Sequence, residues 1–163
     1  RTHHQTRPGL ASLPGATALG PAAGGAGDVT LPLVTFPVTE VPHALVAARL
    51  SAEHAIGVRH GCFCAHPYLI RLLGLGPDEI THHWDAVRRG DRRDMPGAIR
   101  ASAGLSTSDH DIDRLLDAVA DIASGRPAPS TYHQDPTTGD YHPDDTTAPP
   151  HGERAIGAYC ARG

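Results

Sequence analysis

The densest group of reactive side chains lies between Arg59 and Pro67, where the sequence reads Arg-His-Gly-Cys-Phe-Cys-Ala-His-Pro. The thiolate is the nucleophilic and metal-binding form of cysteine, and neighbouring cationic side chains favour its formation. Because Arg59 and His60 lie close to Cys64 in sequence, we interpret Cys64 as a functional thiol rather than as a small buried apolar residue. For Cys62 the buried apolar role is the preferred interpretation.

A zinc site is an alternative use of the same stretch. Cys62, Cys64 and His66 offer thiolate and imidazole ligands of the kind that zinc binds, and His60 or Cys160 could complete the set. Structural zinc sites usually space their cysteines two to four residues apart and add a second pair at a distance, and this sequence lacks that second pair. The pattern therefore supports a zinc module less than a reactive thiol.

Arg100 is a further candidate, because it stands in the otherwise small and apolar segment 97–103. That segment has the pattern of a buried strand, and a buried guanidinium needs a partner. A ligand carboxylate and an Asp or Glu of the same chain are equally good partners on sequence grounds.

The elements that position these residues follow from periodicity, caps and turns. The cysteine cluster should form a loop between a short apolar strand at 55–58 and a helix at 67–74 that begins with Pro and ends before Gly. A strand at 29–38 and a helix at 41–53 should precede the loop, and an insert helix at 76–89 and a strand at 97–103 should follow it. The last helix should begin at Ser108, in a capping box with Asp111, and end at Gly125.

This order of elements predicts a two-layer α/β domain, in which a short sheet packs against helices. We place the domain at residues 29–125, after a loop-rich leader at 1–28 and before a largely irregular tail at 126–163. Hydrophobic residues make up 39% of the chain and aromatic residues 4%, so the core should depend on aliphatic side chains.

Charge and composition exclude several classes of function. A net charge of -4 argues against a general binder of nucleic acid or anionic membrane, and no apolar run is long enough to span a bilayer. The default expectation is a cytoplasmic protein. All 14 basic residues are Arg, so chemistry that needs a Lys amine is excluded for this chain. Because the sequence begins at Arg1 rather than Met, we expect a processed chain or a fragment of a longer protein.

The cysteine loop resembles the Arg-x-Gly-x-x-Cys-Ala loop of the class-V aminotransferases, and within them of the cysteine desulfurases. The resemblance is carried by residues 57–65, by Arg100-Ala101-Ser102 in the following strand, and by Ser106-Thr107-Ser108-Asp109 before the last helix. It covers residues 29–125. It implies the C-terminal small domain of a fold-type-I enzyme that uses pyridoxal 5'-phosphate (PLP).

The resemblance also implies roles for individual residues. Cys64 is the candidate catalytic residue, a persulfide carrier that takes the sulfur of cysteine, and Arg100 is the candidate for binding the substrate carboxylate. Arg59 and His60 are expected in the substrate site as cations beside the thiol. PLP would be held as a Schiff base by a Lys outside this chain, so the chain alone should be inactive. The full-length protein is expected to be a homodimer that acts on a small amino acid, with neither nucleic acid nor membrane as a partner.

Three features depart from the family pattern. The chain has no Lys, Cys62-Phe63 stands where many desulfurases have two histidines, and the insert at 74–96 is long. Three alternatives therefore stay open: a relative of the class-V aminotransferases or lyases without a catalytic thiol, the zinc-binding module, and a non-catalytic interaction domain.

Overall fold

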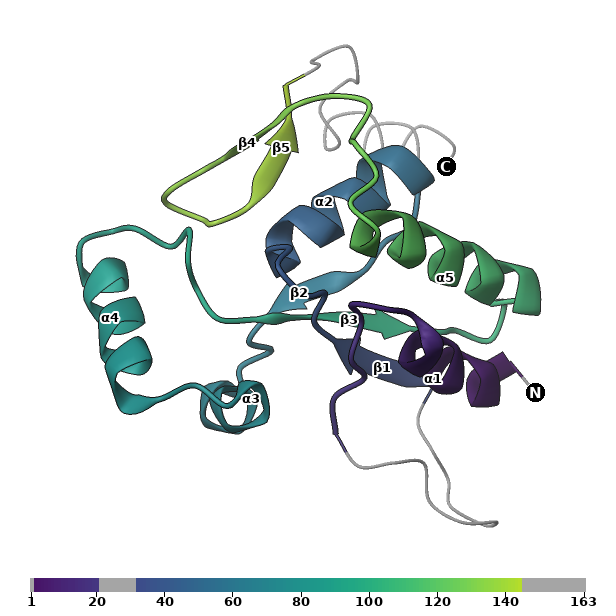
Figure 1. Cartoon of the computed structure of the whole chain (residues 1–163), viewed down its shortest axis with the longest axis horizontal. Coiled ribbons are helices and arrows are strands. Elements are labelled where there is room, and N and C mark those ends of the chain that lie inside the picture. The colour runs from purple at the N-terminus through teal and green to yellow at the C-terminus, as the bar shows by residue number, and fades with distance from the viewer. Residues whose placement is uncertain (1, 21–31, 145–163) are drawn as a thin grey trace, which may run out of the picture.

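A three-stranded antiparallel sheet lies at the centre of the computed structural model, which describes residues 2–20 and 32–144 (Figure 1). Its strands are β1 (Leu33–Phe36), β2 (Arg59–Gly61) and β3 (Ala98–Ser102), in the spatial order β1-β3-β2. In the central strand, Ile99 is opposite Phe36 and His60, and Arg100 is opposite Thr35 and Arg59. Opposed residues share a face and successive residues alternate, so the Ile99 and Arg100 sets lie on opposite faces of the sheet.

The Ile99 face carries the hydrophobic core. It packs against α2 (His43–His54) and α5 (Asp109–Ala123), with α1 (Thr2–Ser12) beside α5 (Figure 1). The inward side chains are aliphatic except for one phenyl ring, as the composition predicts: Leu10, Val34, Phe36, Val46, Leu50, Ile99, Leu115, Val119 and Ile122 are all buried. The predicted two-layer arrangement of sheet and helices is therefore confirmed.

The N-terminus of α5 confirms the predicted capping box. Ser108 Oγ accepts a hydrogen bond from the backbone N–H of Asp111, and Asp111 Oδ2 accepts one from the backbone N–H of Ser108 at 2.9 Å. These two bonds satisfy donors that the first helical turn leaves without partners. The capping box thus fixes the start of α5 at Asp109.

The helix that follows the cysteine loop, α3 (His66–Leu73), and the helix of the insert, α4 (Pro77–Arg88), form a helical arm that lies apart from α2 and α5 (Figure 1). Leu69 is the one buried residue of α3, and α4 has none. Trp84 of α4 is 45% exposed. Among the described residues, no helix has the length and apolar character needed to cross a membrane.

Two local predictions were wrong. The strand expected at 55–58 lies at Arg59–Gly61, because Ala55 takes a left-handed conformation (φ 55°) that caps α2 and turns the chain. The sequence predicts a loop-rich leader with only the end of a helix near residues 10–15, whereas the structure has α1 over Thr2–Ser12 despite Pro8, because α1 packs on α5. Leu10 is fully buried there, and Gly9 lies so close to Leu116 that a Cβ at residue 9 would be 2.5 Å from its Cδ1.

The segment expected to be largely irregular contains a two-stranded hairpin, β4 (Tyr132–Gln134) and β5 (Tyr141–Pro143), which lies alongside α2 (Figure 1). Each strand is three residues long, too short for sequence periodicity to reveal. The expectations for residues 21–31 and 145–163 lie outside the described residues.

Candidate functional site

The cysteine loop is a tight turn between β2 and α3. The N–H of Ala65 donates to the carbonyl of Cys62 at 2.9 Å, and both central residues, Phe63 and Cys64, have positive φ values of 53° and 59°. Two successive positive φ values across such a hydrogen bond are typical of a type I′ turn, which favours Gly and Asn. A bulky residue there costs about 1–3 kcal/mol of backbone strain, and such strain concentrates at functional sites.

The strained turn places Phe63 in contact with Arg100. The Phe63 ring lies against the guanidinium of Arg100, with 5.0 Å between Cζ and the ring centroid. That distance is within the range of a cation–π interaction, which contributes about 0.5–2 kcal/mol. Because Phe63 folds back onto the sheet, the next residue, Cys64, is left exposed to solvent. The turn thus joins the thiol segment to the central strand at Arg100.

Two guanidiniums occupy the sheet face opposite the core. Arg59 and Arg100 are directly opposed on β2 and β3, and like charges in that position destabilise a sheet. Within residues 6–20 and 32–144, neither forms an ion pair with a carboxylate. Arg100 Nε is buried and has no hydrogen-bond partner in the described part of the chain, which costs about 1–3 kcal/mol. An anion between the two side chains would relieve both penalties.

The sequence left two possible partners for Arg100, a ligand carboxylate and an Asp or Glu of the same chain. Among the described residues, no Asp or Glu pairs with Arg100, although the chain contains 18 acidic residues. A guanidinium binds a carboxylate through two parallel hydrogen bonds, and it does so more strongly where water is partly excluded. The face that carries Arg59 and Arg100 therefore has the chemistry of a carboxylate-binding site.

His60 lies on the other face of the sheet. It is opposite Ile99 in the pairing of β2 with β3, so its side chain projects away from Arg59 and Arg100. Its Nδ1 is 3.3 Å from Nδ1 of His43 in α2, and its Nε2 is 3.4 Å from a carboxylate oxygen of Asp140. His60 thus contacts the helix and the hairpin, whereas Arg59 shares its face with Arg100.

The two cysteines of the loop differ in environment. Both are free thiols, with Cys64 exposed and Cys62 half-buried. Three or more His, Cys, Asp or Glu side chains do not gather at any potential metal site in the described part of the chain. The ring of His66 lies near that of Trp84, at 6.0 Å between centroids. Cys160 lies outside the described residues.

Sequence reasoning missed two residues that contact the candidate site residues. Phe63 carried a weak signal, as one of only two phenylalanines and the residue between two cysteines. Asp140 carried no sequence signal, because it lies in the turn of the hairpin, 80 residues after His60. Tertiary folding alone brings Phe63 to Arg100 and Asp140 to His60.

The comparisons with known proteins give partial matches. No protein-family model matches the sequence. The chain is 36% identical over 75 residues to a molybdenum cofactor sulfurase of Anopheles gambiae, and 32% identical over 80 residues to molybdenum cofactor sulfurase 2 of Aedes aegypti. These matches cover 42% and 45% of this chain and 10% of each relative. The chain therefore spans about a tenth of the length of these two relatives.

Among solved structures, the cysteine desulfurase CsdA of Escherichia coli, in its S-sulfonic acid form, aligns with a TM-score of 0.49 and 24% identity. The alignment covers 78% of this chain and 24% of that protein. With a TM-score below 0.5 and an identity below 25%, this alignment supports no function for the chain. The chain is similar, over less than half of its length, to a part of two molybdenum cofactor sulfurases.

Proposed function

We propose that this chain forms the substrate-facing small domain of a PLP-dependent sulfurase or desulfurase of the class-V aminotransferase type. The observation that carries the proposal is a pair of guanidiniums, Arg59 and Arg100, that have no acidic partner among the described residues. They are joined through Phe63 to the turn that exposes Cys64. The two relatives are named as sulfurases, which supports sulfur transfer as the chemistry. The amino-acid substrate is then the anion that the guanidiniums bind.

Arg100 binds the substrate carboxylate in this proposal. Its Nε is buried, with no hydrogen-bond partner among residues 6–20 and 32–144, and its guanidinium lies against the Phe63 ring, so its orientation is largely fixed before a ligand arrives. A fixed guanidinium loses less conformational entropy on binding than a free one, so a larger part of the interaction energy appears as affinity. Arg59, exposed and opposite Arg100, adds a second positive charge that attracts the same anion.

Cys64 accepts the sulfur. Its thiolate attacks the sulfur atom of a substrate cysteine, and a new S–S bond forms on Cys64 as a persulfide. The carbon–sulfur bond of the substrate breaks, and its electron pair stays on the substrate carbon, which takes up a proton to give alanine. An exposed thiol on a turn suits this role, because the persulfide must next be reached by an acceptor.

The residues of this chain do not provide the anchor for PLP. A Schiff base requires a Lys amine, and the chain contains no Lys. PLP supplies electron withdrawal from the bound amino acid, and in this proposal it is held by another part of the protein. The contribution of this chain is to bind the carboxylate and to carry the sulfur.

The test uses the complete PLP-containing protein that includes this chain, supplied with cysteine. Alanine release and persulfide on Cys64, mapped by alkylation and mass spectrometry, are measured for wild type, Cys64→Ser and Cys62→Ser. We expect Cys64→Ser to lose both signals and Cys62→Ser, the matched control, to keep them. Equal alanine release by Cys64→Ser and wild type would remove Cys64 from the mechanism.

The carboxylate site is tested separately with Arg100→Lys, which keeps the charge and loses the two parallel hydrogen bonds. Hydrogen bonds to charged groups contribute about 1.5–3 kcal/mol, so kcat/KM for cysteine should fall by about 10–150-fold. Arg88→Lys on α4, whose side chain is 79% exposed, is the control and should leave kcat/KM unchanged. An unchanged kcat/KM in Arg100→Lys would contradict the assignment of Arg100.

A further inference from the structure

The cysteine turn contains two of the four non-glycine residues that have a positive φ in the described part of the chain: Glu40, Ala55, Phe63 and Cys64. For Ala55 the reason is local, because its N–H caps the last turn of α2 by bonding to the carbonyls of Leu50 and Ser51. Phe63 and Cys64 are consecutive and follow a strand, so a helix cap does not explain them. Their strained conformation therefore needs another contact to stabilise it.

That contact is made by the ring of Phe63 with Arg100. The ring centroid lies 5.0 Å from Cζ of Arg100, which belongs to β3, the central strand of the sheet. A strand paired on both sides is among the parts of a small domain that open least readily. Phe63 is half-buried, and the next residue, Cys64, is exposed. The ring thus connects an exposed thiol, one residue away, to the central strand.

The segments on either side of the turn fix the thiol less well. Before the turn, β2 ends at Gly61, whose φ of 104° directs the chain out of the strand. After the turn, the chain enters α3, whose one buried residue is Leu69. The hydrogen bond that closes the turn, from the N–H of Ala65 to the carbonyl of Cys62, is internal and fixes no position relative to the sheet. The contact of Phe63 provides that position.

We propose that Phe63 is a positioning residue, which holds the Cys64 thiol at a fixed place relative to the guanidinium of Arg100. The inference rests on the proposed function, in which Arg100 binds the substrate carboxylate and Cys64 attacks the substrate sulfur. In cysteine only the α and β carbons separate these two groups. The attacking thiol must therefore occupy a narrowly defined position while the carboxylate stays on Arg100.

Backbone strain and the ring contact act in opposite directions at residue 63. Glycine adopts a positive φ without strain, so glycine at this position would stabilise the turn itself. Glycine has no ring, however, and loss of a cation–π contact changes an equilibrium by about 2–30-fold. Phe63 strains its own turn and contacts a binding residue, a combination that concentrates at functional sites. Replacements of Phe63 can therefore separate the stability of the fold from the position of the thiol.

The first test measures the rigidity of the turn in the 163-residue chain by NMR relaxation. In wild type the backbone amide of Cys64 should be rigid, with an order parameter of about 0.85, and Phe63→Tyr, which keeps a ring, should match it. In Phe63→Leu, and in Arg100→Gln, which removes the charge from β3, the order parameter of Cys64 should fall below about 0.6. Arg59→Gln removes the opposed guanidinium of β2 and is the matched control, which should leave Cys64 rigid.

Two results of this measurement would overturn the proposal. One is an amide of Cys64 that is equally rigid in wild type, Phe63→Leu and Arg100→Gln. The other is an amide of Cys64 that is already mobile in wild type.

Urea unfolding of the same chain measures the stability of the fold separately. Phe63→Gly and Phe63→Leu both lose the ring, but only glycine relieves the backbone, so Phe63→Gly should have the higher urea midpoint. Ala55→Gly relieves a φ of 55° at the end of α2 and should raise the midpoint above that of wild type. Ala55→Gly is thus a control for relief of strain away from the cysteine turn.

The same variants are then compared in the complete PLP-containing protein, supplied with cysteine. Displacing a reacting group by about 1 Å costs about 100-fold in rate, so Phe63→Leu and Phe63→Gly should lower kcat for alanine release by about 10–100-fold. Phe63→Tyr and Ala55→Gly should keep the wild-type kcat. A purely structural role would make kcat follow the urea midpoint, so higher activity in Phe63→Gly than in Phe63→Leu would contradict the positioning role.

The two proposals fail in different ways. Absence of alanine release from wild type would refute the proposed function, and the order parameters of Cys64 would still decide whether Phe63 holds the turn. Wild-type kcat in Phe63→Leu would leave sulfur transfer in place and remove Phe63 from it.

Discussion

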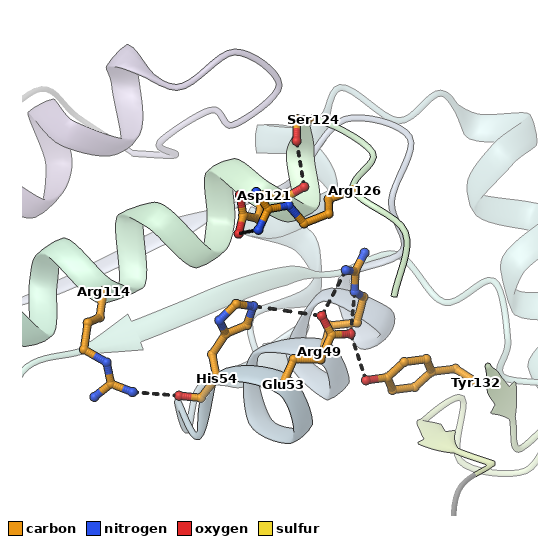
Figure 2. Close-up of polar contacts among 8 residues, drawn as sticks. All are labelled: Arg49, Glu53, His54, Arg114, Asp121, Ser124, Arg126 and Tyr132. Carbon is orange, nitrogen blue, oxygen red and sulfur yellow. Dashed lines mark hydrogen bonds and ion pairs between the residues drawn. The ribbon is translucent and has the colours of Figure 1, made fainter. Parts of the chain in front are cut away.

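Replacing Glu53 by Gln should destabilise the chain strongly, because Glu53 neutralises a buried cation. Arg49 is 7% exposed and donates to Glu53 from Nε at 2.8 Å and from Nη2 at 3.0 Å, within α2. The hydroxyl of Tyr132, from β4, donates to the same carboxylate at 3.0 Å, and His54 Nε2 lies 3.9 Å from it (Figure 2). One carboxylate thus connects the hairpin to the helix.

The expected loss of unfolding free energy follows from the unbalanced charge that Glu53→Gln leaves on Arg49. The amide keeps an oxygen that can accept from Tyr132, but the charge of Arg49 is no longer balanced in a buried position. Breaking a buried ion pair by removing one partner costs about 3–5 kcal/mol. In a chain of this size each kcal/mol lowers the unfolding temperature by roughly 2–4 °C, so we expect a decrease of about 6–20 °C.

Urea and thermal unfolding of wild type and Glu53→Gln provide the measurement, with Asp85→Asn as the matched control. Asp85 pairs with Arg88 at 3.1 Å on α4, but the two side chains are 47% and 79% exposed. Such a surface pair contributes at most about 1 kcal/mol. Equal destabilisation by the two variants would refute the reasoning, because burial is the difference on which it depends.

The pH dependence of the same variant gives a second check. Burial opposes ionisation of Glu53, but hydrogen bonds from Arg49 and Tyr132 outweigh it and lower the pKa of Glu53 below its ordinary value of 4.5. A carboxyl with a lowered folded-state pKa stabilises the protein above its unfolded-state pKa, and this stability is lost as the pH falls through the folded-state value. The difference in unfolding free energy between wild type and Glu53→Gln should therefore shrink below pH 4.5.

Two further substitutions test the core and the cap. Phe36→Ala removes the largest fully buried side chain of the described residues and should cost about 3–5 kcal/mol in urea unfolding. Leu33→Ala, whose side chain is 46% exposed, is the smaller reference. Ser108→Ala removes the acceptor for the Asp111 backbone N–H and should cost about 1 kcal/mol, which Ser108→Asp should restore. A Phe36→Ala cost below that of Leu33→Ala, or a neutral Ser108→Ala, would contradict these assignments.

The elements that sequence predicted well are those with local signals. α5 has apolar residues at helical spacing and a capping box at Ser108, and the structure has both. β3 was expected at 97–103 and lies at Ala98–Ser102, since a run of small apolar residues bounded by Gly is itself local information. In each case the signal lies within the residues that form the element.

The elements that sequence missed depend on distant partners. α1 forms despite Pro8 because it packs on α5, about a hundred residues later. The β4–β5 hairpin is held to α2 by Tyr132, whose hydroxyl donates a hydrogen bond to Glu53, 79 residues earlier in the sequence. Neither contact has a counterpart in composition or periodicity, and stability in such short elements comes from tertiary packing rather than from propensity.

The candidate site was predictable in its residue types but not in its geometry, because sheet register decides the geometry. Arg59 and His60 are adjacent cations, and sequence alone placed both beside the thiol. On β2 they alternate, so Arg59 joins Arg100 on the sheet face opposite the core and His60 turns to His43 and Asp140. A shift of one residue in the pairing of β2 with β3 would exchange the two faces. The separation of Arg59 and His60 onto opposite faces of the sheet therefore follows from the pairing of β2 with β3.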